Sequence, residues 1–173
     1  MSEPSLIEVS IADQALRLIE GDTVTQFSIS TALNGVGEQE GSGCTPRGWH
    51  RICAVIGQGQ PEGSVFVGRR VTGEIYSTEL AQAYPHRDWI LSRILWLQGL
   101  EVGKNRFGSV DSQRRFIYIH GTPDTEPMGE AKSHGCIRMR NADVITLAER
   151  VSATTRVWIQ EASFQRIRCI NVP

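Results

Sequence analysis

The sequence has no long apolar run, no excess of one charge and no paired cysteine motif. Its longest apolar stretch, residues 89–97, is interrupted by Ser92 and Arg93, so we expect no membrane-spanning segment. Eighteen lysines and arginines are balanced by 19 acidic residues, which leaves a formal net charge of −1. This balance offers no electrostatic surface for nucleic acid or an acidic membrane, and we expect neither as a partner.

The first residues also lack the features of an export signal. They contain Glu3, Glu8 and Asp13 and have neither a basic start nor an apolar core. We therefore expect a cytoplasmic protein, or a periplasmic one if a leader has been removed.

Cysteine is scarce, and no Cys-x-x-Cys pair supports a zinc-ribbon or thioredoxin-like class. Without an export signal, free thiols are expected rather than disulfides. Most of the cysteines and histidines are expected to be ordinary core or surface residues, namely Cys44, Cys53, Cys169, His50 and His86.

The chain length and hydrophobic content indicate one domain over residues 1–173. With 173 residues, 40% of them hydrophobic, the chain suffices for a sizeable core, and it shows neither an internal repeat nor a linker. Apolar alternation predicts strands at 6–11, 15–20, 23–31, 49–56, 65–71, 88–97, 115–120 and 155–160. The first three should form an antiparallel meander. Segment 88–97 also fits a helix by periodicity alone, and residues 76–86 show no clear pattern.

One helix is predicted near the C-terminus. Asn141 is expected to cap a helix over residues 142–151, in which apolar residues recur at helical spacing: Val144, Leu147, Ala148 and Val151. The fold class is therefore mainly β (α+β), a β-sandwich-like mixed sheet with one or two helices. The loop at residues 123–132 is long enough to act as a flap.

Residues 133–139, Ser-His-Gly-Cys-Ile-Arg-Met, concentrate reactive side chains. We interpret Cys136 as a nucleophile and His120, at the end of the 115–120 strand, as its base. Tyr118 shares one strand face with His120. The second ring nitrogen of a base needs an acceptor, and no acidic residue lies near His120 in sequence, so a backbone carbonyl around Gly121 is expected.

The neighbours of Cys136 suggest further roles. The amides of Gly135 and Cys136 are candidate oxyanion donors, and Arg138 can hold a carboxylate by a bidentate fork. His134 is an alternative base. A zinc site on His120, His134 and Cys136 is also conceivable, but the spacing is unusual and no fourth ligand is near, so no metal is expected.

These residues carry a resemblance to a known family. His120-Gly121-Thr122, followed after a gap by the 133–139 stretch, resembles the signature of the L,D-transpeptidase family, the YkuD-like catalytic domain. The 15–31 hairpin, the Thr-Pro-Arg-Gly at 45–48 and the segment 96–99 are also similar, so the likeness covers about residues 6–159. The resemblance implies a β-sandwich-like mixed domain with its cleft under a flap, here residues 123–132, and no metal or organic cofactor.

The resemblance also implies a reaction. Cys136 would attack the peptidoglycan tetrapeptide stem at the carbonyl of its third residue, the L-centre of diaminopimelate or lysine, releasing D-alanine and forming a thioester. His120 would be the base and the Gly121 carbonyl would orient it. Ser133, His134 and Gly135 would shape the oxyanion hole and pocket, and Arg138 would orient substrate or brace the loop. Further candidates for substrate contact are Tyr118 and Thr122.

The resemblance leaves the acyl acceptor open. An amine acceptor gives a cross-link or an exchanged D-amino acid, whereas water makes the enzyme an L,D-carboxypeptidase. With no export signal, the expected substrates are recycled muropeptides, so an L,D-carboxypeptidase of cytoplasmic murein recycling is predicted first and an L,D-transpeptidase second. A non-catalytic muropeptide binder is third, and the intact pair of Cys136 and His120 argues against it. Carbapenems acylate the cysteine of many relatives, so carbapenem-type inhibitors are expected partners.

Overall fold

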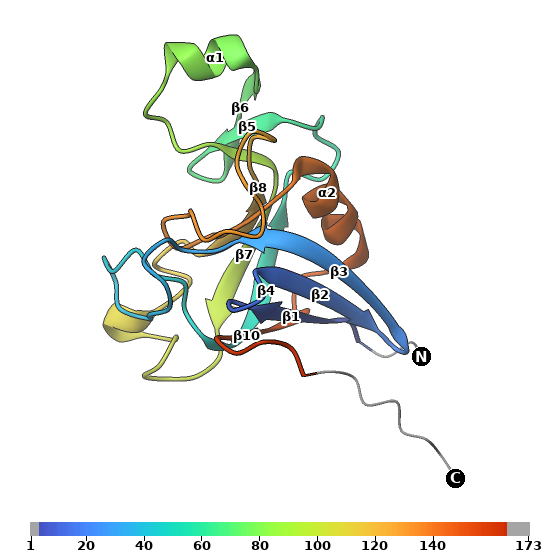
Figure 1. Cartoon of the computed structure of the whole chain (residues 1–173), viewed down its shortest axis with the longest axis vertical. Coiled ribbons are helices and arrows are strands. Elements are labelled where there is room, and N and C mark those ends of the chain that lie inside the picture. Colours follow the sequence, from blue (N-terminus) through green and yellow to red (C-terminus); the bar gives the residue numbers. More distant parts are fainter. Residues whose placement is uncertain (1–3, 166–173) are drawn as a thin grey trace.

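The computed structural model describes residues 4–165, so the free thiol predicted for Cys169 lies outside the described residues. Ten strands form one mixed sheet, accompanied by two α-helices (Figure 1). The strands are β1 (Leu6–Ser10), β2 (Ala15–Glu20), β3 (Thr23–Ser30), β4 (Gly48–Ile56), β5 (Ser64–Val67), β6 (Arg70–Ile75), β7 (Ile90–Gly99), β8 (Tyr118–Gly121), β9 (Ile137–Met139) and β10 (Arg156–Gln160). The helices are α1 (Thr78–Ala83) and α2 (Asn141–Arg150), with a 3₁₀ turn at Gly108–Val110.

The sheet closes on itself into a barrel-like sandwich. Its strand order is β4-β10-β1-β2-β3-β9-β8-β7-β5-β6, and β4 also pairs with β7. The pairs β1–β10 and β8–β9 are parallel, whereas β1, β2 and β3 form the expected antiparallel meander. The predicted fold class, mainly β with one or two helices, is therefore confirmed.

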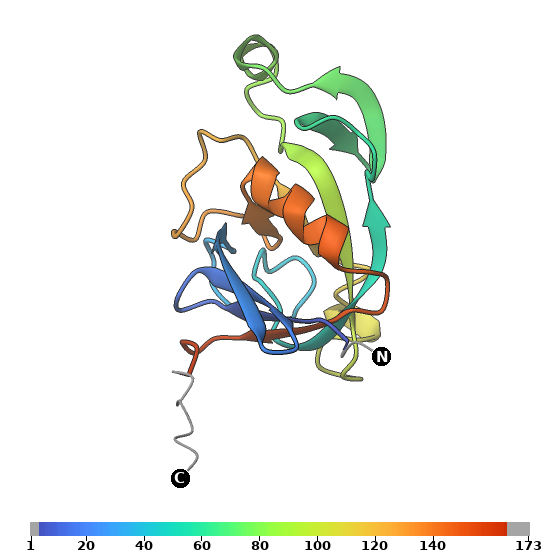
Figure 2. The same cartoon turned by 90° about the vertical axis from the view of Figure 1, so that its right-hand side faces the viewer.

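The core lies inside this closed sheet and beneath α2. Residues Val144, Leu147 and Ala148 of α2 are buried, so the predicted apolar face is correct. Figure 2 shows α2 lying between the group β1–β3 and the long strands β4 and β7. No helix within residues 4–165 is long and apolar enough to cross a membrane.

Two strand predictions differ from the structure, and two elements had not been predicted. The single strand expected at 65–71 is a hairpin of β5 and β6, because Gly68 and Arg69 turn the chain with positive φ of 55° and 66°. Residues 76–86 contain the short α1, whose first turn is capped by the side chain of Ser77. The strand expected from residue 115 begins only at Tyr118, because Phe116 has a φ of 56°. The three-residue β9 is too short for its alternation to be recognised.

His50 in β4 ties the segment leading to β8 to the rest of the sheet. It is fully buried, with Nδ1 3.0 Å from the Gly48 carbonyl oxygen and Nε2 2.8 Å from the Ser112 hydroxyl oxygen. Because a carbonyl only accepts, Nδ1 carries the proton and Nε2 accepts from Ser112. Burial lowers the pKa of His50 to about 4, so the ring is neutral at physiological pH.

We expect His50 to make the protein sensitive to acid. Its pKa is about 4 when folded and about 6.5 when unfolded, so the unfolded chain binds more protons between these values. The free energy of unfolding should therefore fall as the pH falls from 6.5 to 4, with about 3 kcal/mol lost through this residue. Urea unfolding across this range should show that His50→Gln removes the extra loss while His86→Gln, at an exposed site, keeps it. Identical pH dependence in wild type and His50→Gln would contradict the assignment.

Candidate active site

The parallel pairing of β8 with β9 brings Cys136 and His120 to neighbouring strand ends. His120 in β8 is in register with Arg138 in β9, and Cys136 immediately precedes β9. The backbone N–H of Tyr118 donates to Cys136 Sγ at 3.4 Å, and the thiol donates to the Phe116 carbonyl oxygen at the same distance. Cys136 is half-buried and packs against the small cluster that contains Tyr118.

The ring of His120 is held by a backbone carbonyl, as the sequence predicted. Its Nδ1 lies 2.7 Å from the Gly121 carbonyl oxygen, and the side chain is 1% exposed. Since the carbonyl accepts, Nδ1 is protonated and Nε2 keeps its lone pair. Burial lowers the pKa of His120, while the bond to Gly121 opposes that shift. The imidazole is therefore neutral at pH 7 and available as a base.

The thiol of Cys136 is also neutral at rest. Burial raises its pKa to about 11, and the Tyr118 N–H only partly offsets this effect. Burial thus shifts both groups toward their neutral forms, which disfavours a resting thiolate–imidazolium pair. Among the described residues no hydrogen bond joins Cys136 to His120. If Cys136 acts as a nucleophile, its proton would have to leave during the attack.

Gly121 must be a glycine for this arrangement to form. A Cβ there would lie 2.5 Å from the Leu91 carbonyl oxygen and 2.6 Å from Asn141 Oδ1. Asn141 donates to the Thr122 carbonyl oxygen at 2.9 Å and accepts from the Ser92 hydroxyl at 2.6 Å. The prediction that Asn141 caps α2 is wrong, because Arg140 is the N-cap residue and the Asn141 side chain fixes β8 instead.

The loop before Cys136 is held from both sides. The Ser133 hydroxyl donates to the Cys136 carbonyl oxygen and accepts from the Gly135 N–H at 3.3 Å. Thr45 Oγ1 donates to the Gly135 carbonyl oxygen at 2.9 Å. Gly135 has a φ of 134°, a conformation that favours glycine. Its amide, predicted as an oxyanion donor, therefore has a weak internal partner that a substrate oxygen would have to replace.

Arg115 braces the neighbouring loop. Its guanidinium donates to the carbonyl oxygens of Gly37, Glu38 and Cys44 at 3.2, 3.0 and 2.7 Å. The Cys44 carbonyl oxygen lies close to Gly135, since a Cβ added to that glycine would be 3.4 Å from it. Arg115 also lowers the pKa of Cys136 through its charge, although burial dominates that pKa. Arg115 therefore holds the loop that lies next to Gly135 and Cys136.

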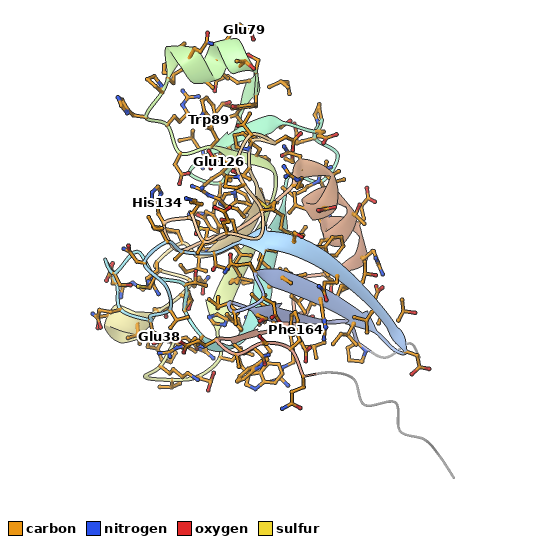
Figure 3. All side chains as sticks on the ribbon, in the orientation of Figure 1. Glu38, Glu79, Trp89, Glu126, His134 and Phe164 are labelled. Carbon is orange, nitrogen blue, oxygen red and sulfur yellow. The ribbon has the colours of Figure 1, made fainter. Side chains whose placement is uncertain are left out.

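Arg138 joins two loops rather than presenting a free fork. Its guanidinium pairs with Asp88 at 3.3 Å and with Glu126, in the 123–132 loop, at 3.5 Å, and the residue is 8% exposed. Of the two roles that the resemblance implied, this geometry supports bracing the loop. Figure 3 shows His134 and Glu126 on the same side of the molecule.

A pocket of about 220 Å³ lies beside these groups, and its lining includes Thr122, His134 and Arg138. His134 is exposed, with Nδ1 4.0 Å from Asp88. Neither Cys136 nor His120 belongs to the lining, so the pocket flanks the reacting pair.

Two predicted substrate contacts are buried. Tyr118 is 5% exposed and its hydroxyl accepts from Arg69 Nη1 at 3.1 Å, so its side chain belongs to the core and only its N–H reaches Cys136. Thr122 is 2% exposed and its N–H donates to the Met139 carbonyl oxygen, although it lines the 220 Å³ pocket. Both side chains are thus largely covered in this structure, and their contact with substrate stays a prediction.

Several site residues escaped the sequence reasoning. Asp88, Glu126 and Arg115 reach the site only through long-range pairing, and no local pattern marks them. Thr45 had a signal, since the Thr-Pro-Arg-Gly segment was already part of the resemblance. The alternative zinc site is not formed, because within residues 4–165 no three histidine, cysteine or acidic side chains gather closely enough to hold a metal ion.

The fold and these groups define a class of closed mixed-β domains that place a cysteine and a carbonyl-oriented histidine at adjoining strand ends. Comparison with known proteins specifies the family. The model of the YkuD L,D-transpeptidase catalytic domain matches residues 4–159, and the chain therefore belongs to this family.

Individual relatives agree with this assignment. The Bacillus subtilis protein YkuD is 56% identical over 41 residues, which are 24% of this chain and 25% of that protein. L,D-transpeptidase 3 from Mycobacterium tuberculosis, solved with a faropenem-derived adduct, aligns over 91% of this chain and 60% of its own, with a TM-score of 0.57 and 15% identity. LdtMt1 in complex with imipenem aligns over 91% and 59%, with a TM-score of 0.52 and 12% identity. The chain thus spans about three-fifths of these solved structures, and the likeness to them shows the fold alone.

Proposed function

We propose that this protein is an L,D-carboxypeptidase that cleaves the bond between the third residue and the terminal D-alanine of a peptidoglycan tetrapeptide stem. The observation that carries the proposal is the neutral His120, oriented by the Gly121 carbonyl, at a strand end adjoining the Cys136 thiol. Membership of the L,D-transpeptidase family supports a peptidoglycan-directed enzyme. The third residue is diaminopimelate, or lysine in a lysine-type wall.

The proposed reaction has two halves. Cys136 Sγ attacks the carbonyl carbon while His120 Nε2 takes the thiol proton, and the charge develops on the carbonyl oxygen near the Gly135 amide. The C–N bond then breaks, and His120 returns the proton to the departing amine of D-alanine. Water next attacks the thioester as His120 accepts its proton. The tripeptide acid leaves and the thiol is restored.

Water is the acceptor in this proposal, and an amine is the acceptor in the rival one. The rival, an L,D-transpeptidase forming cross-links or exchanging D-amino acids, is favoured by the names of the solved relatives. Hydrolysis is favoured if the protein acts on recycled stems inside the cell. Cys44 and Cys53 have free thiols, as expected in a reducing compartment, and we therefore propose murein recycling in the cytoplasm.

Mass spectrometry of the purified protein with a diaminopimelate tetrapeptide tests this function. We expect loss of D-alanine and accumulation of tripeptide, with little change when a free D-amino acid is added as a competing amine. An exchanged tetrapeptide or a cross-linked dimer as the main product would establish the transpeptidase instead. Absence of any turnover would contradict both activities and leave the third prediction, a muropeptide binder.

A further inference from the structure

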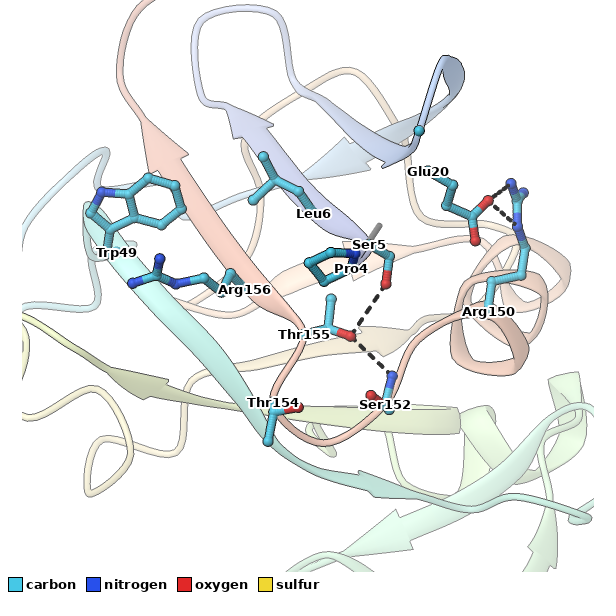
Figure 4. Close-up of a pocket in the computed structure, with 11 residues that line it drawn as sticks. Pro4, Ser5, Leu6, Glu20, Trp49, Arg150, Ser152, Thr154, Thr155 and Arg156 are labelled. Atoms are coloured by element: carbon cyan, nitrogen blue, oxygen red, sulfur yellow. Dashed lines mark hydrogen bonds and ion pairs between the residues drawn. The ribbon is translucent and has the colours of Figure 1, made fainter. Parts of the chain in front are cut away.

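A second and larger cavity lies away from the reacting pair. It has a volume of about 790 Å³, within the usual range for ligand sites. Figure 4 shows Trp49 and Arg156 at one end and the ion pair of Glu20 with Arg150 at the other, with Ser5 and Thr155 between them. The proposed reaction uses none of these side chains.

The aromatic lining residue of this cavity is Trp49, and its ring packs against Trp158, which does not itself line the cavity. Trp49 in β4 and Trp158 in β10 are direct cross-strand partners, with ring centroids 4.9 Å apart and planes inclined by 47°. The guanidinium carbon of Arg156 lies 5.0 Å from the centroid of the Trp49 ring, and the Trp158 indole N–H donates to Gln160 at 2.9 Å. Both rings are half-buried, so they form a fixed platform with one part open to solvent.

The polar groups of this cavity suit an uncharged ligand rich in hydroxyl groups. Arg150 is neutralised by Glu20, which leaves Arg156, stacked on Trp49, as the one lining cation without an acidic partner among the described residues. The other polar lining groups include the hydroxyls of Ser5, Ser152 and Thr155. An apolar platform beside hydroxyls and a planar guanidinium matches a sugar ring, which has apolar C–H faces and a polar rim.

We propose that this cavity binds the saccharide of a sugar-linked peptidoglycan fragment, an inference that rests on the proposed function. The C–H face of one sugar packs on Trp49, and Arg156 together with the serine and threonine hydroxyls forms hydrogen bonds with its substituents. The lining includes none of the large hydrophobic side chains that are exposed elsewhere on the described surface, which disfavours an apolar protein partner.

The cavity lies on the same sheet face as the approach to the nucleophile. Strand register places Tyr118 opposite Trp96, and Arg51 opposite Gln98, with Arg51 Nε donating to Gln98 at 2.7 Å. Trp96 and Gln98 alternate onto one face of β7, as Arg51 and Trp49 do on β4. Trp49 and the Tyr118 position beside Cys136 therefore share one face of the sheet.

The separation predicts which substrate makes both contacts. Along β4, Trp49 is five residues from Ala54, a distance of about 16 Å. Ala54 pairs with Trp96, which pairs with Tyr118, so Tyr118 lies two strand spacings, or about 10 Å, farther across the sheet. Three extended stem residues cover only about 10 Å. The stem peptide alone therefore falls short, and the sugar portion that carries it must supply the rest of the separation.

Binding is tested by NMR on the full ¹⁵N-labelled chain, titrated with a soluble oligomer of N-acetylglucosamine and, as a control, a maltooligosaccharide of equal length. We expect the indole signals of Trp49 and Trp158 to shift and those of Trp89 and Trp96 to stay. Trp49→Ala should weaken binding at least about tenfold, and Arg156→Ala, at an exposed site that cannot collapse the fold, about fivefold. Glu62→Ala, on the remote loop before β5, is the matched control and should change nothing. Absence of shifts, or shifts at Trp89 or Trp96 alone, would overturn the site.

Kinetics separate this inference from the proposed function. Wild type should show a lower KM for a tetrapeptide carried on an oligosaccharide strand than for the free tetrapeptide. Trp49→Ala and Arg156→Ala should raise the KM for the oligosaccharide-linked tetrapeptide and leave the KM for the free tetrapeptide unchanged. Indole shifts without turnover of either substrate would refute the proposed function and leave the saccharide site standing. Turnover of both substrates with equal KM and no indole shifts would support the proposed function and refute the saccharide site.

Discussion

Replacing Cys136 by alanine should abolish turnover and leave the fold intact. The attacking atom is lost, and no other thiol among residues 4–165 is joined to the His120 strand by a backbone N–H as Cys136 is by Tyr118. We expect less than about 1% of wild-type kcat, since removal of a nucleophile commonly costs several orders of magnitude. Turnover of a tetrapeptide, with circular dichroism to verify folding, is the measurement.

Cys53→Ala is the matched control for this result. Cys53 is a half-buried free thiol in β4, and burial raises its pKa as it raises that of Cys136. The control should keep its activity and should gain one imipenem adduct by intact-protein mass spectrometry, whereas Cys136→Ala should gain none. Residual activity above a few per cent in Cys136→Ala, or an unchanged adduct, would refute the nucleophile assignment.

His120→Ala should lower kcat by roughly 10² or more, because a positioned general base contributes about 10² to 10⁴. The loss should be large here because the pKa of Cys136, raised to about 11, leaves almost no spontaneous thiolate at neutral pH. His134→Ala, at a side chain 78% exposed, is the comparison and should cost less than His120→Ala. A loss below about fivefold for His120→Ala, with a larger one for His134→Ala, would make His134 the base.

The pH profile supplies an independent check on the base. Protonated His120 cannot accept the thiol proton, so kcat/KM should fall as the pH falls through the pKa of this residue. Because burial lowers that pKa below its usual value of 6.5, the acid limb should lie below pH 6.5 and the neutral range should be flat. An acid limb centred above pH 7 would contradict a buried, neutral His120.

The balance of charge around Arg138 explains why the flap loop lies where it does. One guanidinium meets Asp88 from the segment before β7 and Glu126 from the 123–132 loop, so two segments distant in sequence share a single cation. The Arg138 side chain is largely buried, whereas both carboxylates are about half exposed. A substrate that approaches this pocket therefore meets carboxylates before it meets the arginine.

Most strands were readable from the sequence, and the exceptions share one cause. Alternation and residue type identified β1, β2, β3, β4 and β10, which are runs of several residues. β7 is buried on both faces, so its periodicity was ambiguous and only its tryptophan, isoleucine and leucine content indicated a strand. Alternation failed at Gly68-Arg69 and at Phe116, where positive φ turns the chain inside an apolar pattern, and at β9, which has only three residues. The capping prediction for Asn141 failed for another reason: its side chain bonds the Thr122 carbonyl oxygen next to β8 rather than the start of the helix.

The sequence by itself marked Cys136 and His120 as the candidate reacting residues and predicted the carbonyl acceptor of His120. It did so because each motif is a short contiguous run of residues, and because Gly121 directly follows the histidine that it orients. Only the tertiary structure decided which groups surround them: Thr45 on Gly135, Arg115 on the Cys44 carbonyl oxygen, and Asp88 and Glu126 on Arg138. The same holds for the facing Trp49 and Trp158, which are 109 residues apart. Such neighbours depend on which strands pair and in what register, and that choice is made by the burial of the whole sheet.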